Sequence, residues 1–211
     1  MKKTLTIDLL RHGEPHGGDI LRGRVNPELT ETGWNQMRQS TSDAALNSAS
    51  QWHSIITSPL ARCRAFAETF SGEQGIDCRP DDQWQEIDYG DWDGLPIARW
   101  RELAADQFKA FRQDESALKP PGGENFVDFR DRVLAALQSL GQYPDGAHLL
   151  LVTHGGVMRV VIPWVLGMPL NRSFPLHIPF ACLSRLTLRV GEEPIKPSDL
   201  SLVFHNRAGF H

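Results

Sequence analysis

Residues 5–13 read Leu-Thr-Ile-Asp-Leu-Leu-Arg-His-Gly, an apolar run that leads directly into an arginine, a histidine and a glycine. The run Leu5–Leu10 predicts a β-strand. Residues 149–156, Leu-Leu-Leu-Val-Thr-His-Gly-Gly, repeat this pattern. Near-continuous apolar strands are typical of a parallel sheet that is covered on both faces. The polar residues that follow two such strands are therefore expected to lie together at one edge of the sheet.

Strands and helices alternate along the rest of the chain. Further strands are predicted at Ser54–Thr57, Cys182–Val190 and, more weakly, Leu202–Phe204. Helical patterns lie at Trp34–Leu46, Leu60–Phe70, Ile97–Phe111, Phe126–Leu140 and Val157–Leu166. This alternation predicts an α/β fold, a three-layer α/β/α sandwich with a mostly parallel central sheet. With 211 residues, of which 40% are hydrophobic, the chain is expected to form one domain over residues 1–211.

Composition excludes several classes of partner. A net charge of −4 provides no general basic field, which argues against nucleic acid or a membrane surface as partner. The three cysteines are widely spaced and form no Cys-x-x-Cys pair, so a disulfide framework and a thiolate zinc site are not indicated, and a cytoplasmic location fits. The longest apolar stretch, residues 157–166, is too short to span a membrane, which needs about 20 residues.

Three predicted strands end in residues that suit phosphate. Arg11 and His12 follow the first strand, His154 and Gly155 follow a later one, and the strand Ser54–Thr57 leads into a helix start that carries Arg62. Ligands of open α/β sheets bind at the carboxyl edge of the strands. Glycines and the amides of a helix start accept an anion closely, and guanidinium forks match its oxygens. We therefore predict a phosphate site there, to which Arg22 and Arg24 are possible additions.

Glu86 lies in residues 84–94, a segment of aromatics, carboxylates and glycines that suits a loop over a pocket. A carboxylic acid in such a loop is a candidate to protonate a leaving oxygen. Each of these residues alone has an ordinary explanation, as a structural histidine, a solvated arginine or an acidic surface loop. Their occurrence together after corresponding strands favours the functional interpretation. Ser58 and Cys63 lack the sequence context of a nucleophile, so histidine chemistry is predicted.

The motifs resemble those of the histidine phosphatase superfamily, also called phosphoglycerate-mutase-like. Residues 10–14 resemble its Arg-His-Gly signature, residues 29–33 a helix start, residues 58–62 its second arginine motif, residues 86–94 its acid-donor loop and residues 152–156 its second histidine motif. The resemblance implies that His12 is the nucleophile and Glu86 the proton donor. It implies further that the phosphate pocket contains Arg11, Arg62, His154 and the amide of Gly155, with no metal and no organic cofactor. Candidate substrate contacts are Arg22, Gly23, Arg24 and Tyr89.

Within that superfamily, residues 11–18, 21–23, 121–124 and 181–185 look most like those of bacterial α-ribazole phosphatase-like members. This implies α-ribazole phosphate as a substrate and a role in cobalamin biosynthesis. Pro15, Gly17 and Gly18 stand where many members have polar residues, and Phe66 where a threonine is common. These departures leave the predicted phosphate-binding residues unchanged. They put in doubt how the leaving group is bound, so the substrate is not carried over from the family.

The function expected is hydrolysis of a small-molecule phosphomonoester through a phosphohistidine intermediate. A phosphoglycerate-mutase-type phosphotransferase is the nearest alternative, although residues 94–122 are short for the insertion that encloses a mutase substrate. A metal-dependent hydrolase using His12, His154 and Glu86 is disfavoured by the arginines, which would crowd a cation. A phosphate-binding scaffold would be expected to lack His12 or Glu86. The oligomeric state is left open by the sequence.

Overall fold

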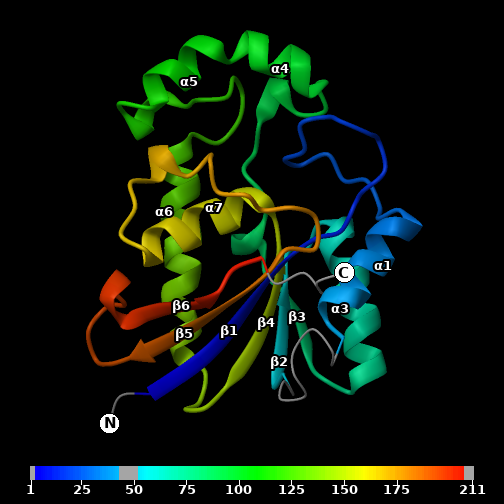
Figure 1. Cartoon of the computed structure of the whole chain (residues 1–211), viewed down its shortest axis with the longest axis vertical. Helices are drawn as coiled ribbons and strands as arrows, with labels where there is room; N and C mark the ends of the chain where they lie inside the picture. Colours follow the sequence, from blue (N-terminus) through cyan, green and yellow to red (C-terminus); the bar gives the residue numbers. More distant parts are fainter. Residues whose placement is uncertain (1–2, 43–51, 207–211) are drawn as a thin grey trace.

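The computed structural model describes residues 3–42 and 52–206, so the predicted helical residues 43–46 lie outside it. A six-stranded sheet with strand order β3-β2-β4-β1-β5-β6 occupies its centre (Figure 1). The strands are β1 (Lys3–Arg11), β2 (Ser54–Thr57), β3 (Cys78–Pro80), β4 (His148–Thr153), β5 (Leu183–Val190) and β6 (Leu200–Phe204). Strands β1 to β4 are parallel to one another, β5 is antiparallel to β1, and β6 is antiparallel to β5. The predicted α/β fold with a mostly parallel sheet is confirmed.

Helices cover both faces of this sheet, and two more lie beyond one end of it (Figure 1). The helices are α1 (Glu31–Ser40), α3 (Ala61–Gln74), α4 (Ile97–Leu103), α5 (Ala105–Phe111), α6 (Phe126–Ser139) and α7 (Gly155–Val165). Helices α1 and α3 pack on one face and α6 and α7 on the other. Helices α4 and α5 stand above the end of the sheet toward which β1 points.

Side-chain alternation gives the two faces of β1 different characters. Leu5, Ile7 and Leu9 join the buried cluster under α6 and α7. Leu10 joins the cluster under α1 and α3. Successive residues of a strand point to opposite faces, so Asp8 lies on the same face as Leu10. Asp8, fully buried among these residues, accepts hydrogen bonds from Arg185 and from the indole of Trp52.

The structure differs from the predicted elements at two places that affect the site. The helix predicted over Ile97–Phe111 is two helices, α4 and α5, because the backbone turns at the buried Ala104, where ψ is 0°. The turn brings the rings of Trp100 and Phe108 together at 5.1 Å. Helix α7 begins at Gly155 and not at Val157, so the amides of both glycines belong to its first turn.

Strand β3 was not predicted, since three residues that include an arginine and a proline show no apolar run. The remaining predicted elements are present, with ends that differ by a few residues. Two helices begin with a capping side chain: Thr30 and Asn125 accept hydrogen bonds from the amides of Gly33 and Asp128. In the described part of the chain, no helix combines the length and apolar content that crossing a membrane requires.

Candidate active site

His12 and His154 each follow the end of a strand, and these two strands, β1 and β4, are neighbours in the sheet. Strands β1 and β4 pair in parallel, with Arg11 opposite Thr153. The amide of His12 donates to the carbonyl of Thr153 at 2.9 Å, which ties the two strand ends together. The rings of His12 and His154 lie 5.3 Å apart between centroids, in an edge-to-face arrangement. The structure therefore brings the two strand-end histidines together, as the sequence predicts.

The imidazole of His12 is held in one tautomer. Its Nδ1 lies 2.8 Å from the carbonyl oxygen of Gly13, which can only accept, so Nδ1 carries the proton. In a neutral ring the lone pair is then on Nε2. Burial, followed by the charges of Arg11 and Arg62, lowers the pKa of His12 well below its usual value. The ring is therefore neutral near pH 7 and has a free nitrogen lone pair.

Arg11 lies beside His12, between a backbone carbonyl and an aromatic ring. It donates to the carbonyl of Ile178 at 2.6 Å, and its guanidinium carbon stands 4.3 Å from the ring centre of Phe180. The same ring is 5.7 Å from that of His12. Burial lowers the pKa of Arg11 to about 10, so it remains a cation at neutral pH. Within the described ranges, no carboxylate forms an ion pair with it.

Arg62 is fully buried at the start of α3. Its two terminal nitrogens donate to the carbonyls of Gly23 and Val25, each at 2.8 Å. The carboxylate of Asp93 accepts hydrogen bonds from the amides of Gly23, Arg24 and Val25 at 2.6–2.7 Å, and these bonds hold the loop in place. In the sequence, Asp93 is one of several carboxylates in residues 84–94. The structure instead makes it the support for the loop that orients Arg62.

Glu86 is buried beside the first turn of α7. Its Oε1 accepts the amide of Ile87 at 3.0 Å and its Oε2 accepts the amide of Gly156 at 2.9 Å. A Cβ at position 156 would lie 2.0 Å from Oε1 of Glu86. Gly156 thus leaves room for this carboxylate and also binds it. The sequence signal for that role was the second glycine after His154.

His154 is fully buried and contacts the start of α3. Its Nε2 lies 2.7 Å from the hydroxyl of Ser58, and the sulfur of Cys63 packs 3.6 Å from the same nitrogen. Burial, then Arg62 and His12, lower the pKa of His154 well below its usual value. Burial raises the pKa of the Cys63 thiol to about 12, which leaves it protonated and unreactive. Ser58 and Cys63 therefore both contact His154, and neither is among the residues that line the cavity over His12.

A cavity of about 340 Å³ opens over His12. The predicted site residues that line it are Arg11, His12, Arg22, Glu86, Tyr89 and Gly155. Arg62, His154, Gly23 and Arg24 are not among its lining residues. Trp100, Phe180 and Arg159 also line it, and none of these three belongs to a motif from which the site was predicted. Helix α4 supplies part of this wall through Ile97, Trp100 and Arg101.

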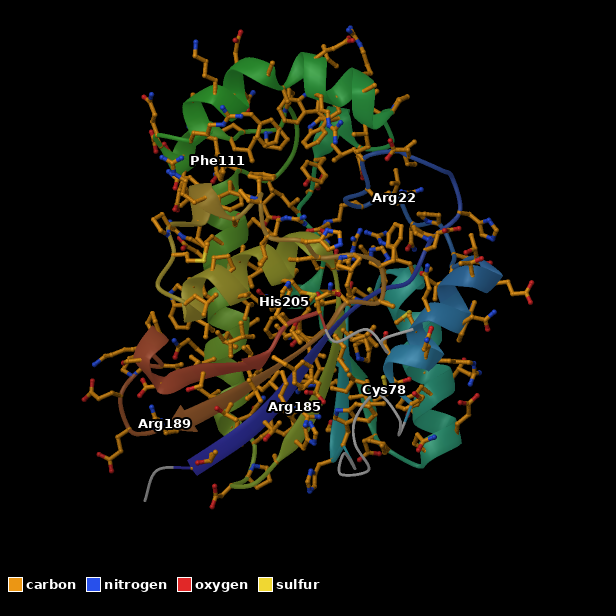
Figure 2. All side chains as sticks on the ribbon, viewed as in Figure 1. Arg22, Cys78, Phe111, Arg185, Arg189 and His205 are labelled. Carbon is orange, nitrogen blue, oxygen red and sulfur yellow. The ribbon has the colours of Figure 1, made fainter. Side chains whose placement is uncertain are left out.

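Arg22 lines the cavity, but its guanidinium is used within its own loop (Figure 2). It donates to the backbone carbonyls of His16, Gly18 and Ile20. Its main structural effect is therefore to order residues 16–20. A second cavity, of about 520 Å³, lies against this loop and shares Asp19, Arg22 and Phe180 with the first. Phe180 thus stands between the two spaces.

Metal-ligand geometry is not formed by these residues. Over residues 3–42 and 52–206, no three histidine, cysteine, aspartate or glutamate side chains converge as a metal site would require. Glu86 directs its carboxylate at two backbone amides, and cationic Arg11 adjoins His12. The arrangement suits an anion, because the neutral imidazole of His12, guanidinium groups and the first turn of α7 line one cavity.

Known proteins resemble this chain along most of its length. The sequence profile of the histidine phosphatase superfamily (branch 1) matches residues 7–196. The bifunctional protein Rv2228c of Mycobacterium tuberculosis is 32% identical over 178 residues, which cover 83% of this chain and 48% of that protein. The chain thus spans about half the length of that relative. Probable phosphoglycerate mutase GpmB of Salmonella choleraesuis is 30% identical over 184 residues, covering 86% of this chain and 84% of that protein.

Solved structures show the same architecture. The mycobacterial glucosyl-3-phosphoglycerate phosphatase Rv2419c superposes with a TM-score of 0.77 at 25% identity, over 98% of this chain and 99% of that one. The α-ribazole phosphatase of Shigella flexneri superposes with a TM-score of 0.74 over 96% and 97% of the two chains. Its identity is 22%, so that likeness concerns the fold alone.

Proposed function

The chain belongs to the histidine phosphatase superfamily, and on that premise we propose that it hydrolyses a small phosphomonoester through a phosphohistidine formed on His12. The resemblance read from the motifs is thereby confirmed at the level of the family. The observation that carries the proposal is the Nδ1–H of His12 donating to Gly13, which leaves Nε2 as a nucleophile at the cavity that Arg11 and Glu86 also line.

The first step forms a bond between Nε2 of His12 and phosphorus while the ester P–O bond breaks in line. Arg11, Arg62 and His154 stabilise charge on the equatorial oxygens, and the amide of Gly155 adds a donor. Glu86, in its protonated form, gives its proton to the departing oxygen. The products of this step are the free alcohol, the phosphohistidine and the Glu86 carboxylate.

The second step returns the enzyme to its starting state. Water attacks the phosphorus of the phosphohistidine, the P–N bond breaks, and the Glu86 carboxylate takes the proton of the water. Inorganic phosphate leaves and His12 is again neutral. One carboxyl group therefore acts first as acid and then as base, and the scheme draws on no cofactor.

Replacement of the nucleophile tests this scheme. His12→Ala is expected to lower kcat on phenyl phosphate by roughly 1,000-fold or more, because it removes the nitrogen that accepts the phosphoryl group. The matched control, His16→Ala, removes an exposed imidazole near the same loop and should keep activity. Wild-type protein incubated with ³²P-labelled substrate and quenched in alkali should carry acid-labile label that His12→Ala lacks. Undiminished turnover by purified His12→Ala would rule out the mechanism.

A mutase is the second candidate, because the chain covers 84% of a relative named as a phosphoglycerate mutase. The same phosphohistidine transfers its phosphoryl group to a second hydroxyl if water is kept from it. Incubation with 3-phosphoglycerate distinguishes the two reactions. Release of inorganic phosphate without 2-phosphoglycerate supports hydrolysis, and formation of 2-phosphoglycerate in excess of phosphate supports the mutase.

α-Ribazole phosphate is the named substrate that we propose to test first, with the role in cobalamin biosynthesis that it implies. Its support is the similarity of residues 11–18 and 181–185 to the motifs of that subfamily. Turnover of α-ribazole phosphate should be ranked by kcat/KM against a panel of other phosphorylated metabolites. A rank below several unrelated esters would remove it as the substrate.

A further inference from the structure

Arg159 lines the active-site cavity, and the proposed reaction gives it no role. It lies on α7 one turn after Gly155. Its hydrogen bonds are long, 3.5 Å to the carbonyl of Gly155 and 3.4 Å to that of Leu176, whereas both bonds of Arg62 measure 2.8 Å. Its Nε is buried without an acceptor. In the part of the chain that the structure describes, no carboxylate pairs with it.

The position of Arg159 is next to the reacting groups. One of its terminal nitrogens and Nε of Arg11 lie 3.2 and 3.3 Å from the point that a Cβ on Gly155 would occupy. The following residue, Gly156, donates its amide to Glu86. Arg159 therefore lies beside Arg11, near the carboxyl group that would protonate the leaving oxygen. A group attached close to that oxygen would come within its reach.

More positively charged side chains line the cavity than the binding of one phosphoryl group requires. Its lining contains four arginines (Arg11, Arg22, Arg101 and Arg159) and two carboxylates (Asp19 and Glu86), although the whole chain has a net charge of −4. The guanidinium of Arg22 is engaged by backbone carbonyls, and Arg101 is exposed at the end of α4. Arg159 is left as a partly buried cation without a counter-ion, a costly arrangement unless a ligand supplies one.

We infer that Arg159 binds a carboxylate carried by the leaving group, so that the preferred substrates are phosphomonoesters with a second negative charge near the ester oxygen, a class to which α-ribazole phosphate does not belong. The inference rests on the proposed hydrolysis at His12. A guanidinium offers two parallel donors that match the two oxygens of a carboxylate. Apolar side chains, including Trp100 and Phe126, line the cavity as well, so the carbon skeleton of the leaving group has a surface on which to pack.

A charged substrate and its neutral isostere test the inference. The wild-type protein should turn over 3-carboxyphenyl phosphate with a kcat/KM at least roughly 10-fold above that of 3-carbamoylphenyl phosphate. Arg159→Met should abolish that preference through a rise in KM for the carboxylate, with little change for the carboxamide. Arg159→Lys should restore part of it. The matched control, Arg99→Met, removes the same charge from an exposed position on α4 outside the cavity lining and should keep the preference.

Binding to His12→Ala, measured by calorimetry, separates this inference from the proposed function. Tighter binding of 3-carboxyphenyl phosphate than of the carboxamide, lost on adding Arg159→Met, supports the inference even if the wild-type protein fails to hydrolyse either compound. In that case the proposed hydrolysis fails alone. Equal binding of both compounds, or parallel losses for both in Arg159→Met, would overturn the role of Arg159 while leaving His12 chemistry intact.

Discussion

Gly156 shows how a single backbone position controls a side chain of the site. The residue donates its amide to Glu86 and leaves the space that the carboxylate fills. Glutamate is flexible, so an added methyl group would push its carboxylate aside and not distort the helix backbone. Glu86 would then lose both its fixed position and one of its two amide donors. The effect is expected on proton transfer and not on folding.

Gly156→Ala is therefore expected to lower kcat about 100-fold on an alkyl phosphate, whose departing oxygen needs a proton. The loss should be much smaller on 4-nitrophenyl phosphate, whose leaving group departs as a stable anion. Measuring kcat for both substrates checks this. Gly72→Ala, at a helical position with open space around its Cβ, is the control and should leave both rates unchanged. Equal losses on both substrates would show that Glu86 is not the affected group.

At the scale of elements, one loop, residues 23–25, connects β1, α3 and the segment before α4. Carbonyls of this loop accept hydrogen bonds from the guanidinium of Arg62 on α3, and its amides donate to Asp93 in the segment before α4. A Cβ on Gly23 would lie 2.3 Å from the carbonyl oxygen of Ile87, so the loop packs tightly on that segment. Arg62 is oriented by carbonyls whose own positions depend on one carboxylate.

Asp93→Asn is expected to lower kcat/KM on phenyl phosphate by roughly 10-fold, because an amide side chain replaces one accepting oxygen by a donor facing backbone N–H groups. The exposed Asp91 lies two residues away, and Asp91→Asn provides the matched control. Steady-state kinetics on both variants measure the difference. If Asp93→Asn keeps wild-type kcat/KM while remaining folded, the loop does not control Arg62.

At the scale of the whole molecule, the buried histidines of the site reduce the free energy of unfolding at low pH. His12 and His154 are buried beside cations, and their pKa values lie well below those of an unfolded chain. The unfolded state therefore binds protons below about pH 6.5 that the folded state does not. The free energy of unfolding is at its full value above that pH and falls as the pH decreases toward the lowered pKa values.

Burial and hydrogen bonding change the pKa of Asp8 in opposite directions. Burial raises the pKa of this carboxyl group, but the hydrogen bonds with Arg185 and His148 lower it by more, so the pKa is lowered overall. The stability that this group contributes is present above its ordinary pKa near 3.8 and is lost as the pH falls below that value. The loss lies in a more acidic range than that of the two histidines.

Urea unfolding of the wild-type protein between pH 7.5 and about pH 5 should show this fall. His12→Ala should reduce the slope by about 1.4 kcal/mol per pH unit below pH 6.5, the value for one proton. The variant removes the titrating group, so the comparison concerns the slope and not the absolute stability. Identical slopes for the two proteins would mean that His12 is protonated in the folded state.

The sequence by itself determined the fold class and indicated the residues that the proposed reaction uses. Apolar runs and the residues that follow them are local features, so the ends of β1, β2 and β4 could be read directly. Knowing that parallel strands share one carboxyl edge was then sufficient to group Arg11, His12 and His154. The segment around Glu86 indicated a loop over a pocket with a candidate acid, and the family motifs identified Glu86 as the proton donor by resemblance.

Only the tertiary structure decided how those residues are supported and what lies opposite them. Gly156 and Glu86 are 70 residues apart, as are Asp93 and Gly23, and no local pattern joins either pair. Arg159 reads in the sequence as one polar residue in an apolar helix, and its missing counter-ion becomes visible only in the folded chain. Hydrogen-bond partners and uncompensated charges depend on distances between segments, which the order of residues does not state.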